Sequence, residues 1–416
     1  MKRLLAACAV SAALAAAGGA AAQNLVIANA RIIVGDGQVI EKGSVVVTDG
    51  KIASVAAGAA PAAAKGAVRI DGTGKTVIAG YIDAHRHLIR RPADLDTAPD
   101  QMRELLEAGF TTVQSGGDDN AGIVELKRRI DRGEIKGPRI LAAWRDPIMT
   151  MKTEGEVRAA VRAAKAAGAD SIAELHYPSK EPPNPPTFQD TRNLMAALDE
   201  GRKIGIPVQI HAVSPASTVG AAVVGGKKLI HTPHFDWLTE AEADAVREAG
   251  AEVASCTGFG PPVFDVFNQE NKPTFRDGKP WPQGIVSNEG QGREGGLLPV
   301  NGRMLFDHGV TYGYCTDTTY NATAALNQEL KTLNLVFSPT DIIKIMGPNS
   351  AKFIDRGADL GTIQPGKTAD IVVLGANPLV GFWNFMTAEV VIKGGVVMVD
   401  KRGQPNAGKP MARPQN

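Results

Sequence analysis

The sequence has few cysteines, few aromatic residues and no excess of charge of either sign. Three cysteines occur in 416 residues, and aromatic residues make up 5% of the chain. Cys256 and Cys315 lie far from the N-terminus, and two cysteines in so long a chain are not a disulfide framework. Lysine and arginine (45) balance aspartate and glutamate (44). We therefore expect no binding of nucleic acid or of an anionic membrane surface.

Long hydrophobic runs are also absent beyond the N-terminus, so no membrane-spanning helix is expected there. Residues 1–22 combine Lys2 and Arg3 with an Ala-rich apolar run and small residues at 20–22. This order is typical of a secretory signal peptide cut near Gln23, and the run is short for the alternative, a membrane anchor. The sequence thus predicts an exported protein, periplasmic or secreted, that is free of the membrane after cleavage.

The two ends of the remaining chain resemble each other in composition. Short runs rich in valine and isoleucine, separated by glycine and aspartate, occupy residues 24–78 and return within residues 359–416. Such runs are typical of β-strands joined by tight turns. Neither end is long enough to bury a core alone, so we expect one composite β-sandwich built from both termini.

The central residues 79–358 alternate between strand-like and helical patterns. Helices are expected at 100–108, 154–167, 191–203 and 239–249, and strands at 111–113, 140–143, 171–175, 208–210, 228–230 and 311–315. This alternation predicts an α/β fold with parallel strands, most simply a (β/α)8 TIM barrel. An open doubly wound sheet is the alternative, but no Gly-rich nucleotide turn follows the first strand. Two long segments, 178–186 and about 258–302, are expected to be binding loops or plain surface excursions.

Several predicted strands end in side chains that bind metals. His85 and His87 alternate along one strand, so both point to the same face. His211, His231 and Asp317 each follow a later strand, and parallel strands of a barrel bring these ends together. Imidazole and carboxylate ligands favour Zn²⁺, as one ion or two, although another divalent metal would also fit.

The sequence resembles the amidohydrolase superfamily over nearly the whole chain after the predicted signal peptide. The run Gly-Tyr-Ile-Asp-Ala-His-Arg-His at 80–87 is similar to its first-strand motif, and His211, His231 and Asp317 match the later strand positions. Residues 348–352 and 360–374 are similar to its C-terminal signatures. The imidazolonepropionase-like and prolidase-like members look most similar. The resemblance implies a barrel with a composite β-sandwich and a metal-dependent hydrolase acting on carbon–nitrogen bonds.

The fourth predicted strand departs from the family pattern. Many members carry there a carboxylated lysine that bridges two metals, whereas this chain has Ala173 followed by Glu174. Alternation points Glu174 and His176 toward the barrel interior. Glu174 is therefore predicted as a metal ligand, or else as a hydrogen-bond partner of a ligand histidine. His176 is predicted as a substrate contact or as a polar residue at the barrel mouth.

The predicted chemistry is hydrolysis of an amide in a small-molecule substrate by activated water. Asp317 is expected to accept and return the proton of that water, and His231 to help polarise the carbonyl group. A lactone, an ester or a deamination reaction would use the same site, but no acid follows His211 as it does in deaminating relatives. The alternative outside the enzymes is a barrel that has lost catalytic activity and only binds a ligand. The sequence leaves a homo-oligomer open.

Overall fold

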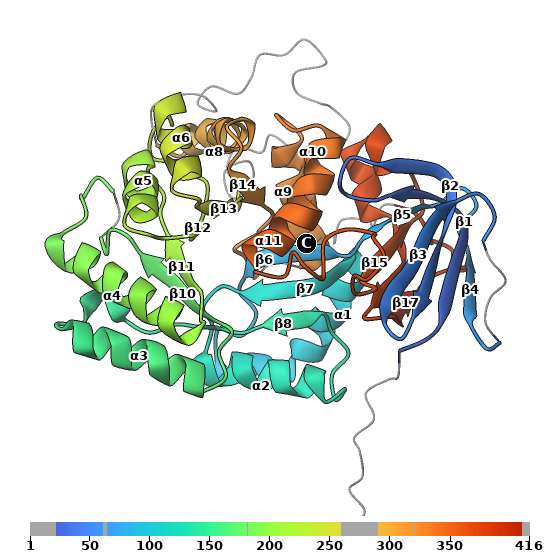
Figure 1. The fold of residues 1–416 in the computed structure, drawn as a ribbon, viewed down its shortest axis with the longest axis horizontal. Coiled ribbons are helices and arrows are strands. Elements are labelled where there is room, and N and C mark those ends of the chain that lie inside the picture. The colour runs from blue at the N-terminus through green and yellow to red at the C-terminus, as the bar shows by residue number, and fades with distance from the viewer. Residues whose placement is uncertain (1–21, 61–64, 181, 259–289, 320, 410–416) are drawn as a thin grey trace, which may run out of the picture.

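The computed structural model describes residues 22–60, 65–180, 182–258, 290–319 and 321–409. The predicted signal peptide, apart from its last residue, lies outside this range. Figure 1 shows two regions side by side, an α/β region and a β-sheet region that combines the blue start and the red end of the chain. Among the described residues, no helix has both the length and the apolar character needed to cross a membrane.

The β-sheet region is one eight-stranded sheet, with strand order β17-β16-β15-β5-β1-β2-β3 and with β4 paired to β1. Its strands are β1 (Leu25–Ile33), β2 (Val39–Thr48), β3 (Lys51–Ala57), β4 (Val68–Asp71), β5 (Thr76–Ala79), β15 (Ile371–Leu374), β16 (Ala388–Lys393) and β17 (Val396–Asp400). The two ends of the chain meet where β5 and β15 pair antiparallel. As predicted, strands from both termini share one structure.

The alternating side chains of β15 show how this sheet joins the rest of the molecule. Ile371 and Val373 pack into the sheet's own apolar cluster, whereas Val372 and Leu374 pack into the large cluster of the α/β region. Successive side chains of a strand point to opposite faces, so one short strand contributes to two cores. The sheet is therefore fixed against the α/β region through buried contacts.

The α/β region contains parallel strands in two sheets, β6-β7-β8 and β9-β10-β11-β12-β13-β14 in spatial order. They are β6 (Tyr81–Arg86), β7 (Phe110–Ser115), β8 (Arg139–Leu141), β9 (Ala143–Trp144), β10 (Ser171–His176), β11 (Val208–His211), β12 (Lys228–Ile230), β13 (Glu252–Ala254) and β14 (Thr311–Gly313). Backbone hydrogen bonds also join the first and last of these elements: Ala84 N donates to Tyr314 O, and Asp317 N to His85 O.

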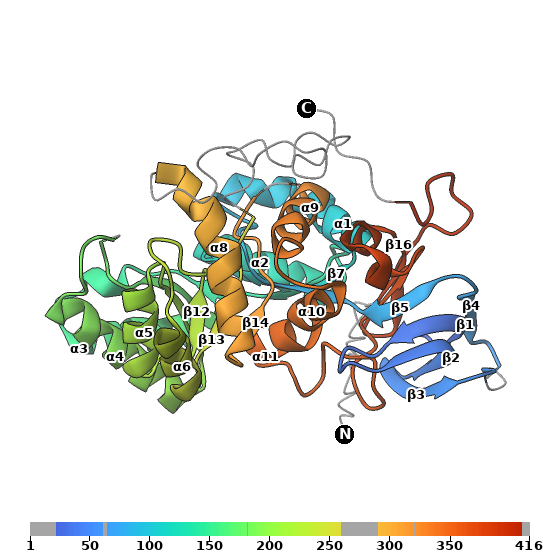
Figure 2. The same ribbon diagram turned by 90° about the horizontal axis from the view of Figure 1, so that it is seen from above.

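Helices alternate with these strands and lie around them in Figures 1 and 2. They are α1 (Ala98–Ala108), α2 (Asn120–Asp131), α3 (Glu154–Ala166), α4 (Phe188–Ile204), α5 (Pro215–Val223), α6 (Glu240–Glu248), α8 (Gly290–Asp307), α9 (Ala322–Leu333), α10 (Pro339–Lys344) and α11 (Ser350–Phe353). Several start at a residue whose hydroxyl accepts a hydrogen bond from the first turn, including Thr153, Thr187 and Thr239. The predicted starts of α3 and α6 lie within one residue of the observed ones, whereas that of α4 is three residues late, and the N-caps define where these helices begin.

Two features of this region were not predicted from the sequence. Strand β13 is only three residues long, and its one branched apolar side chain, Val253, leaves no readable alternation. The predicted loop at 258–302 ends in a helix, because α8 begins at Gly290. Residues 259–289 of that loop lie outside the described part of the chain.

Candidate metal centre

His85 lies on β6, His87 follows the last residue of that strand, and both are buried. Nδ1 of His85 donates to Oε1 of Gln209 (3.3 Å), and Nδ1 of His87 donates to Oδ1 of Asp118 (3.2 Å). With Nδ1 donating to these oxygens, Nε2 is the nitrogen of each ring that would bind a metal, in place of a proton. The two Nε2 atoms lie 3.2 Å and 3.0 Å from Oδ1 of Asp317. The predicted pair therefore converges with Asp317, as expected.

Close approach of these rings depends on the backbone of the neighbouring strand. Gly116 follows β7, and a Cβ atom at this position would lie 3.0 Å from Nε2 of His85 and 3.0 Å from Cε1 of His87. Alanine at 116 would therefore crowd both rings. The glycine and the partners Asp118 and Gln209 were missed by sequence reasoning, although each is a small or polar residue within or just after a predicted strand.

Glu174 reaches the same centre from β10. Its backbone has a φ of 46°, and the pairing of β10 with β11 shifts register between Ile172 and Leu175. A residue other than glycine with positive φ is uncommon and bends the strand locally. Oε1 of Glu174 lies 3.7 Å from Nε2 of His85 and 3.6 Å from Nδ1 of His211. The carboxylate thus lies between the histidines of two elements.

His211 and His231 complete the group from the ends of β11 and β12. Their rings meet edge to face, with centroids 4.5 Å apart. Nε2 of His231 lies 4.0 Å from Oε1 of Glu174 and 3.7 Å from Oδ2 of Asp317. His176, at the end of β10, stacks on His211 with ring centroids 4.1 Å apart. All seven predicted site residues therefore belong to one cluster.

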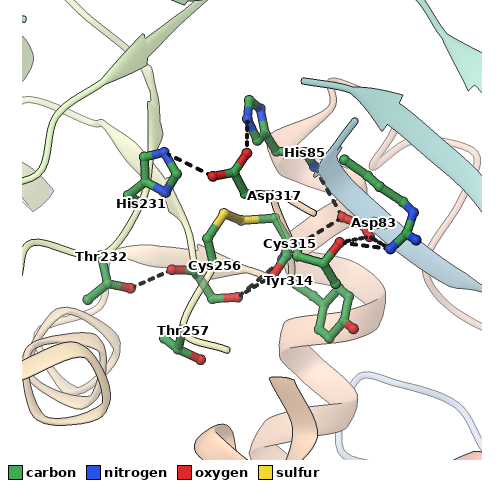
Figure 3. Close-up of a disulfide and its surroundings, with 12 residues drawn as sticks. Asp83, His85, His231, Thr232, Cys256, Thr257, Tyr314, Cys315 and Asp317 are labelled. Carbon is green, nitrogen blue, oxygen red and sulfur yellow. Dashed lines mark hydrogen bonds and ion pairs between the residues drawn. A yellow bond between two sulfur atoms is a disulfide. The ribbon is translucent and has the colours of Figure 1, made fainter. Parts of the chain in front are cut away.

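Figure 3 shows Asp317 between the rings of His85 and His231. Its backbone N–H donates to the carbonyl oxygen of His85 (2.8 Å), which ties the end of β14 to β6. Like Glu174, Asp317 has a positive φ, here 47°. Its position is therefore fixed by the backbone as well as by its side-chain contacts.

The cluster fits a divalent metal, and it divides into two groups that share Glu174. One group is His85, His87, Glu174 and Asp317, and the other is Glu174, His211 and His231, with the donor atoms of each group within 4.8 Å of one another. Nε2 of His85 and Nε2 of His231 are buried and make no hydrogen bond with the described residues. Buried polar atoms without partners are rare, and here they converge on carboxylates. The cluster could bind one or two divalent ions.

Electrostatics favour a cation at this centre. Burial by itself lowers the pKa of His85, but the adjacent Asp317 and Glu174 raise it to about 10. Although burial opposes ionisation, contacts with His211 and His85 hold the pKa of Glu174 far below its usual range. The contacts of Asp317 with His85 and His87 likewise lower its pKa. Both carboxylates are ionised, so the cluster attracts positive charge.

Comparison with known proteins agrees with this geometry. Residues 76–398 match the model of the amidohydrolase family, which covers most of the chain. The chain belongs to the amidohydrolase family. The family match and the relatives below indicate that this amidohydrolase is a hydrolase that acts on carbon–nitrogen bonds, with a small molecule as its substrate.

Individual relatives are distant but match along most of their length. The chain is 22% identical to an imidazolonepropionase of Thermoanaerobacter pseudethanolicus over 397 residues, covering 80% of this amidohydrolase and 84% of the relative. It is 23% identical to an imidazolonepropionase of Mesorhizobium japonicum over 389 residues, with coverages of 80% and 87%. A Xaa-Pro dipeptidase structure with bound methionine in the active site has a TM-score of 0.74 at 21% identity, with coverages of 90% and 99%. The last comparison shows a shared fold.

Arg86, between the two first-strand histidines of this amidohydrolase, is not part of the metal-binding cluster. As alternation predicts, Arg86 points away from the cluster, and its Nη1 donates to Oγ1 of Thr316 (3.2 Å). Asp83 accepts from the hydroxyl of Thr316 (2.6 Å) and lies 3.9 Å from Arg86. Asp83, Arg86 and Thr316 therefore connect β6 to the segment that carries Asp317.

A disulfide joins Cys256 and Cys315 beside the cluster (Figure 3). The two residues follow the adjacent strands β13 and β14, and both are buried. Ser255 reinforces this link, because its Oγ accepts from Cys315 N (3.1 Å) and donates to Glu329 (2.5 Å). The sequence did not predict this pair, since β13 was not recognised. The bond fixes the strand end two residues before Asp317.

Proposed function

We propose that this amidohydrolase uses the cluster as a two-metal centre to hydrolyse an amide bond. The proposal is supported by six buried or half-buried donor side chains that converge in two groups sharing Glu174. Within the described structure, Nε2 of His85 and Nε2 of His231 make no hydrogen bond. A site built only for stability would pair such atoms with each other.

Zinc is the metal we propose, in view of the imidazole and carboxylate donor set. One ion would be held by His85, His87 and Asp317, the other by His211 and His231, and Glu174 would bridge them in place of the lysine of many relatives. A divalent metal bound here would lower the pKa of its bound water to about 7 and polarise a substrate carbonyl.

Side chains of the protein would transfer the proton of the attacking water to the leaving nitrogen. Asp317 is ionised because His85 and His87 lower its pKa, so it can accept a proton from the attacking water. The same carboxyl group then returns the proton to the leaving nitrogen. Burial and the neighbouring His211 lower the pKa of His231, which keeps this ring neutral beside the reacting carbonyl. Asp317 and His231 are thus the catalytic residues in our proposal.

Substrate contacts would come from the carboxyl ends of the strands. His176, half-buried and stacked on His211, would contact the substrate. Relatives named imidazolonepropionase and Xaa-Pro dipeptidase support a cyclic or peptide-like amide as the substrate.

We also propose an architecture and a location. The hydrogen bonds from Ala84 to Tyr314 and from Asp317 to His85 support closure of the parallel strands into one (β/α)8 barrel across residues 79–358. Residues 24–78 and 359–416 would form the composite β-sandwich. Residues 1–22 would be a signal peptide, and the protein would be exported to the periplasm or beyond.

Metal analysis together with a substrate panel tests this function. We expect two zinc ions per purified chain and hydrolysis of at least one compound among amides, dipeptides and cyclic amides, lost on chelation and restored by zinc. Glu174→Gln should bind at most one ion, because a neutral amide cannot bridge two cations, whereas the exposed Glu248→Gln serves as control. Unchanged metal content in Glu174→Gln would exclude the bridging role. Bound zinc without hydrolysis of any compound would contradict the enzymatic proposal.

A further inference from the structure

We propose that Arg145 binds a carboxylate of the substrate next to the scissile bond. The preferred substrates would then be amides with a free carboxylate one or two atoms from the scissile nitrogen, such as N-acyl amino acids or dipeptides. This inference rests on the proposed amide hydrolysis and adds the substrate class to it.

The backbone of Arg145 is held firmly at the mouth of the strands. Arg145 directly follows β9, the neighbour of β10 that carries Glu174. Its N–H donates to Oδ1 of Asn120 (2.8 Å), and its carbonyl oxygen accepts from Nδ2 of the same side chain (2.9 Å). This two-way pairing with the first residue of α2 fixes where the arginine side chain starts.

Small neighbours let the side chain reach toward the metal ligands. A Cβ atom at Gly117 would lie 3.3 Å from Cδ of Arg145 and 3.0 Å from Cβ of Ala173. Gly117 also has a φ of +94°, which other residues rarely adopt. The arginine stem therefore runs along a surface that glycine and alanine keep open, with its guanidinium group directed to Glu174.

The guanidinium group has unused hydrogen-bonding capacity. Nη1 of Arg145 lies 3.8 Å from Oε2 of Glu174, and its side chain makes no hydrogen bond with the described residues. Oε2 is the oxygen that faces away from the histidines, since Oε1 is the one that His85 and His211 approach. By contrast, Arg139 donates to Asp370 at 2.7 Å. Arg145 is also 46% exposed, so a ligand can reach it.

The chemistry follows from this position. An arginine offers a planar pair of donors that match a carboxylate, and it stays charged at any working pH. Because the group lies beside a metal ligand, a carboxylate bound to it must belong to a substrate atom close to the reacting carbonyl. In the reaction, water oxygen bonds to the carbonyl carbon, the carbon–nitrogen bond breaks, and the nitrogen takes the proton. Arg145 takes part in none of these bond changes and only positions the substrate.

The test compares acids with matched neutral compounds. N-acetylglycine, N-acetyl-L-methionine and N-acetyl-L-proline would be compared with the corresponding alcohols, which keep the same scissile amide but lack the carboxylate. We expect the zinc-loaded protein to prefer the acids by about 10- to 100-fold in kcat/KM, the size of a charge-assisted hydrogen-bond pair. Arg145→Gln should lose that preference through a raised KM for the acids, with unchanged metal content and a smaller change for the alcohols. Arg162→Gln on the outer helix α3, where Arg162 pairs with Glu200, is the control.

Each outcome decides between the two proposals. Equal hydrolysis of acids and alcohols by the wild-type protein would overturn the role of Arg145 and leave amide hydrolysis standing. Equal losses for acids and alcohols in Arg145→Gln, with less metal, would also overturn it, since the arginine would then merely support Glu174. If no compound is hydrolysed, calorimetric titration with the same acids and alcohols decides. Acid binding that is at least tenfold tighter and requires Arg145 supports the inference, and its absence overturns it.

Discussion

The two ends of the parallel strands treat their buried polar groups in different ways. At the amino ends, Lys228 donates to Glu252 (3.0 Å), to Asp355 (2.7 Å) and to the carbonyl oxygen of Lys352 (3.2 Å). All three of its N–H groups therefore have acceptors. At the carboxyl ends, Nε2 of His85 lies beside a carboxylate without an aligned hydrogen bond. Lys228 therefore has a full set of acceptors within the protein, whereas Nε2 of His85 and of His231 converge on carboxylates as metal ligands would.

Backbone conformation separates the two ends as well. Seven non-glycine residues in the described structure have positive φ. Four of them, Glu174, His231, Cys256 and Asp317, lie at or just after the carboxyl ends of parallel strands, whereas one, Asp355, contacts Lys228 at the amino ends. Such conformations are costly for ordinary residues and collect at functional sites. The amino ends, in contrast, border a cavity of about 670 Å³ lined in part by Ser171, Lys228 and Glu252, but none of the ligand candidates. A hollow alone therefore does not mark the active end, whereas the convergence of histidines and carboxylates on a positive-φ backbone does.

Asp317→Asn should give the largest effect at the carboxyl ends. The amide keeps the shape and an oxygen ligand but cannot accept the proton of the attacking water. We expect kcat to fall by about 100- to 10,000-fold, the usual contribution of a general base, with zinc still bound. Steady-state kinetics and metal analysis measure this, with the exposed Asp244→Asn as control. A loss below tenfold would remove Asp317 from the proton-transfer role.

Removal of the Cys256–Cys315 disulfide tests how much this bond stabilises the carboxyl ends of β13 and β14. The bond closes a separation of 59 residues, so Cys256→Ala/Cys315→Ala should lose about 2 to 4 kcal/mol of unfolding free energy. Because Cys315 lies two residues before Asp317, we expect metal affinity to weaken as well. Urea unfolding and zinc titration without reductant measure both effects. The reduced wild-type protein is the matched comparison, and equal stability of the oxidised protein and the double variant would contradict this role.

The sequence predicted those parts of the site that depend on local alternation. His85 and His87 were placed on one face because they are two residues apart in a strand, and the alternation of strand four pointed Glu174 inward. His211, His231 and Asp317 followed from the rule that parallel strands end at the same edge. The same reasoning predicted that both termini contribute strands to one structure, as β5 and β15 show.

Residues whose roles depend on distant partners could not be predicted in this way. Asp118, in the segment after β7, and Gln209, on β11, orient the two first-strand histidines, and nothing in their own segments indicates that contact. The Cys256–Cys315 bond required β13 and β14 to be neighbours, and β13 is too short to show a period. Arg145 looks like any arginine after a strand until Gly117 and Ala173 are seen beside it. Local sequence patterns predict which way a side chain points, but which distant residues it contacts is known only from the fold.

Lys228→Met should have the smallest effect on activity and so sharpens the contrast between the two ends. Methionine fills a similar volume, but Glu252, which is largely buried, loses its donor. We expect a loss of about 1 to 3 kcal/mol in unfolding free energy, with kcat/KM changed by less than about twofold. The exposed Lys203→Met on α4 should change stability by less than about 0.5 kcal/mol. If Lys228→Met instead lowered zinc content or kcat more than tenfold at nearly unchanged stability, the amino ends would share in catalysis, and the division of roles between the two ends would be wrong.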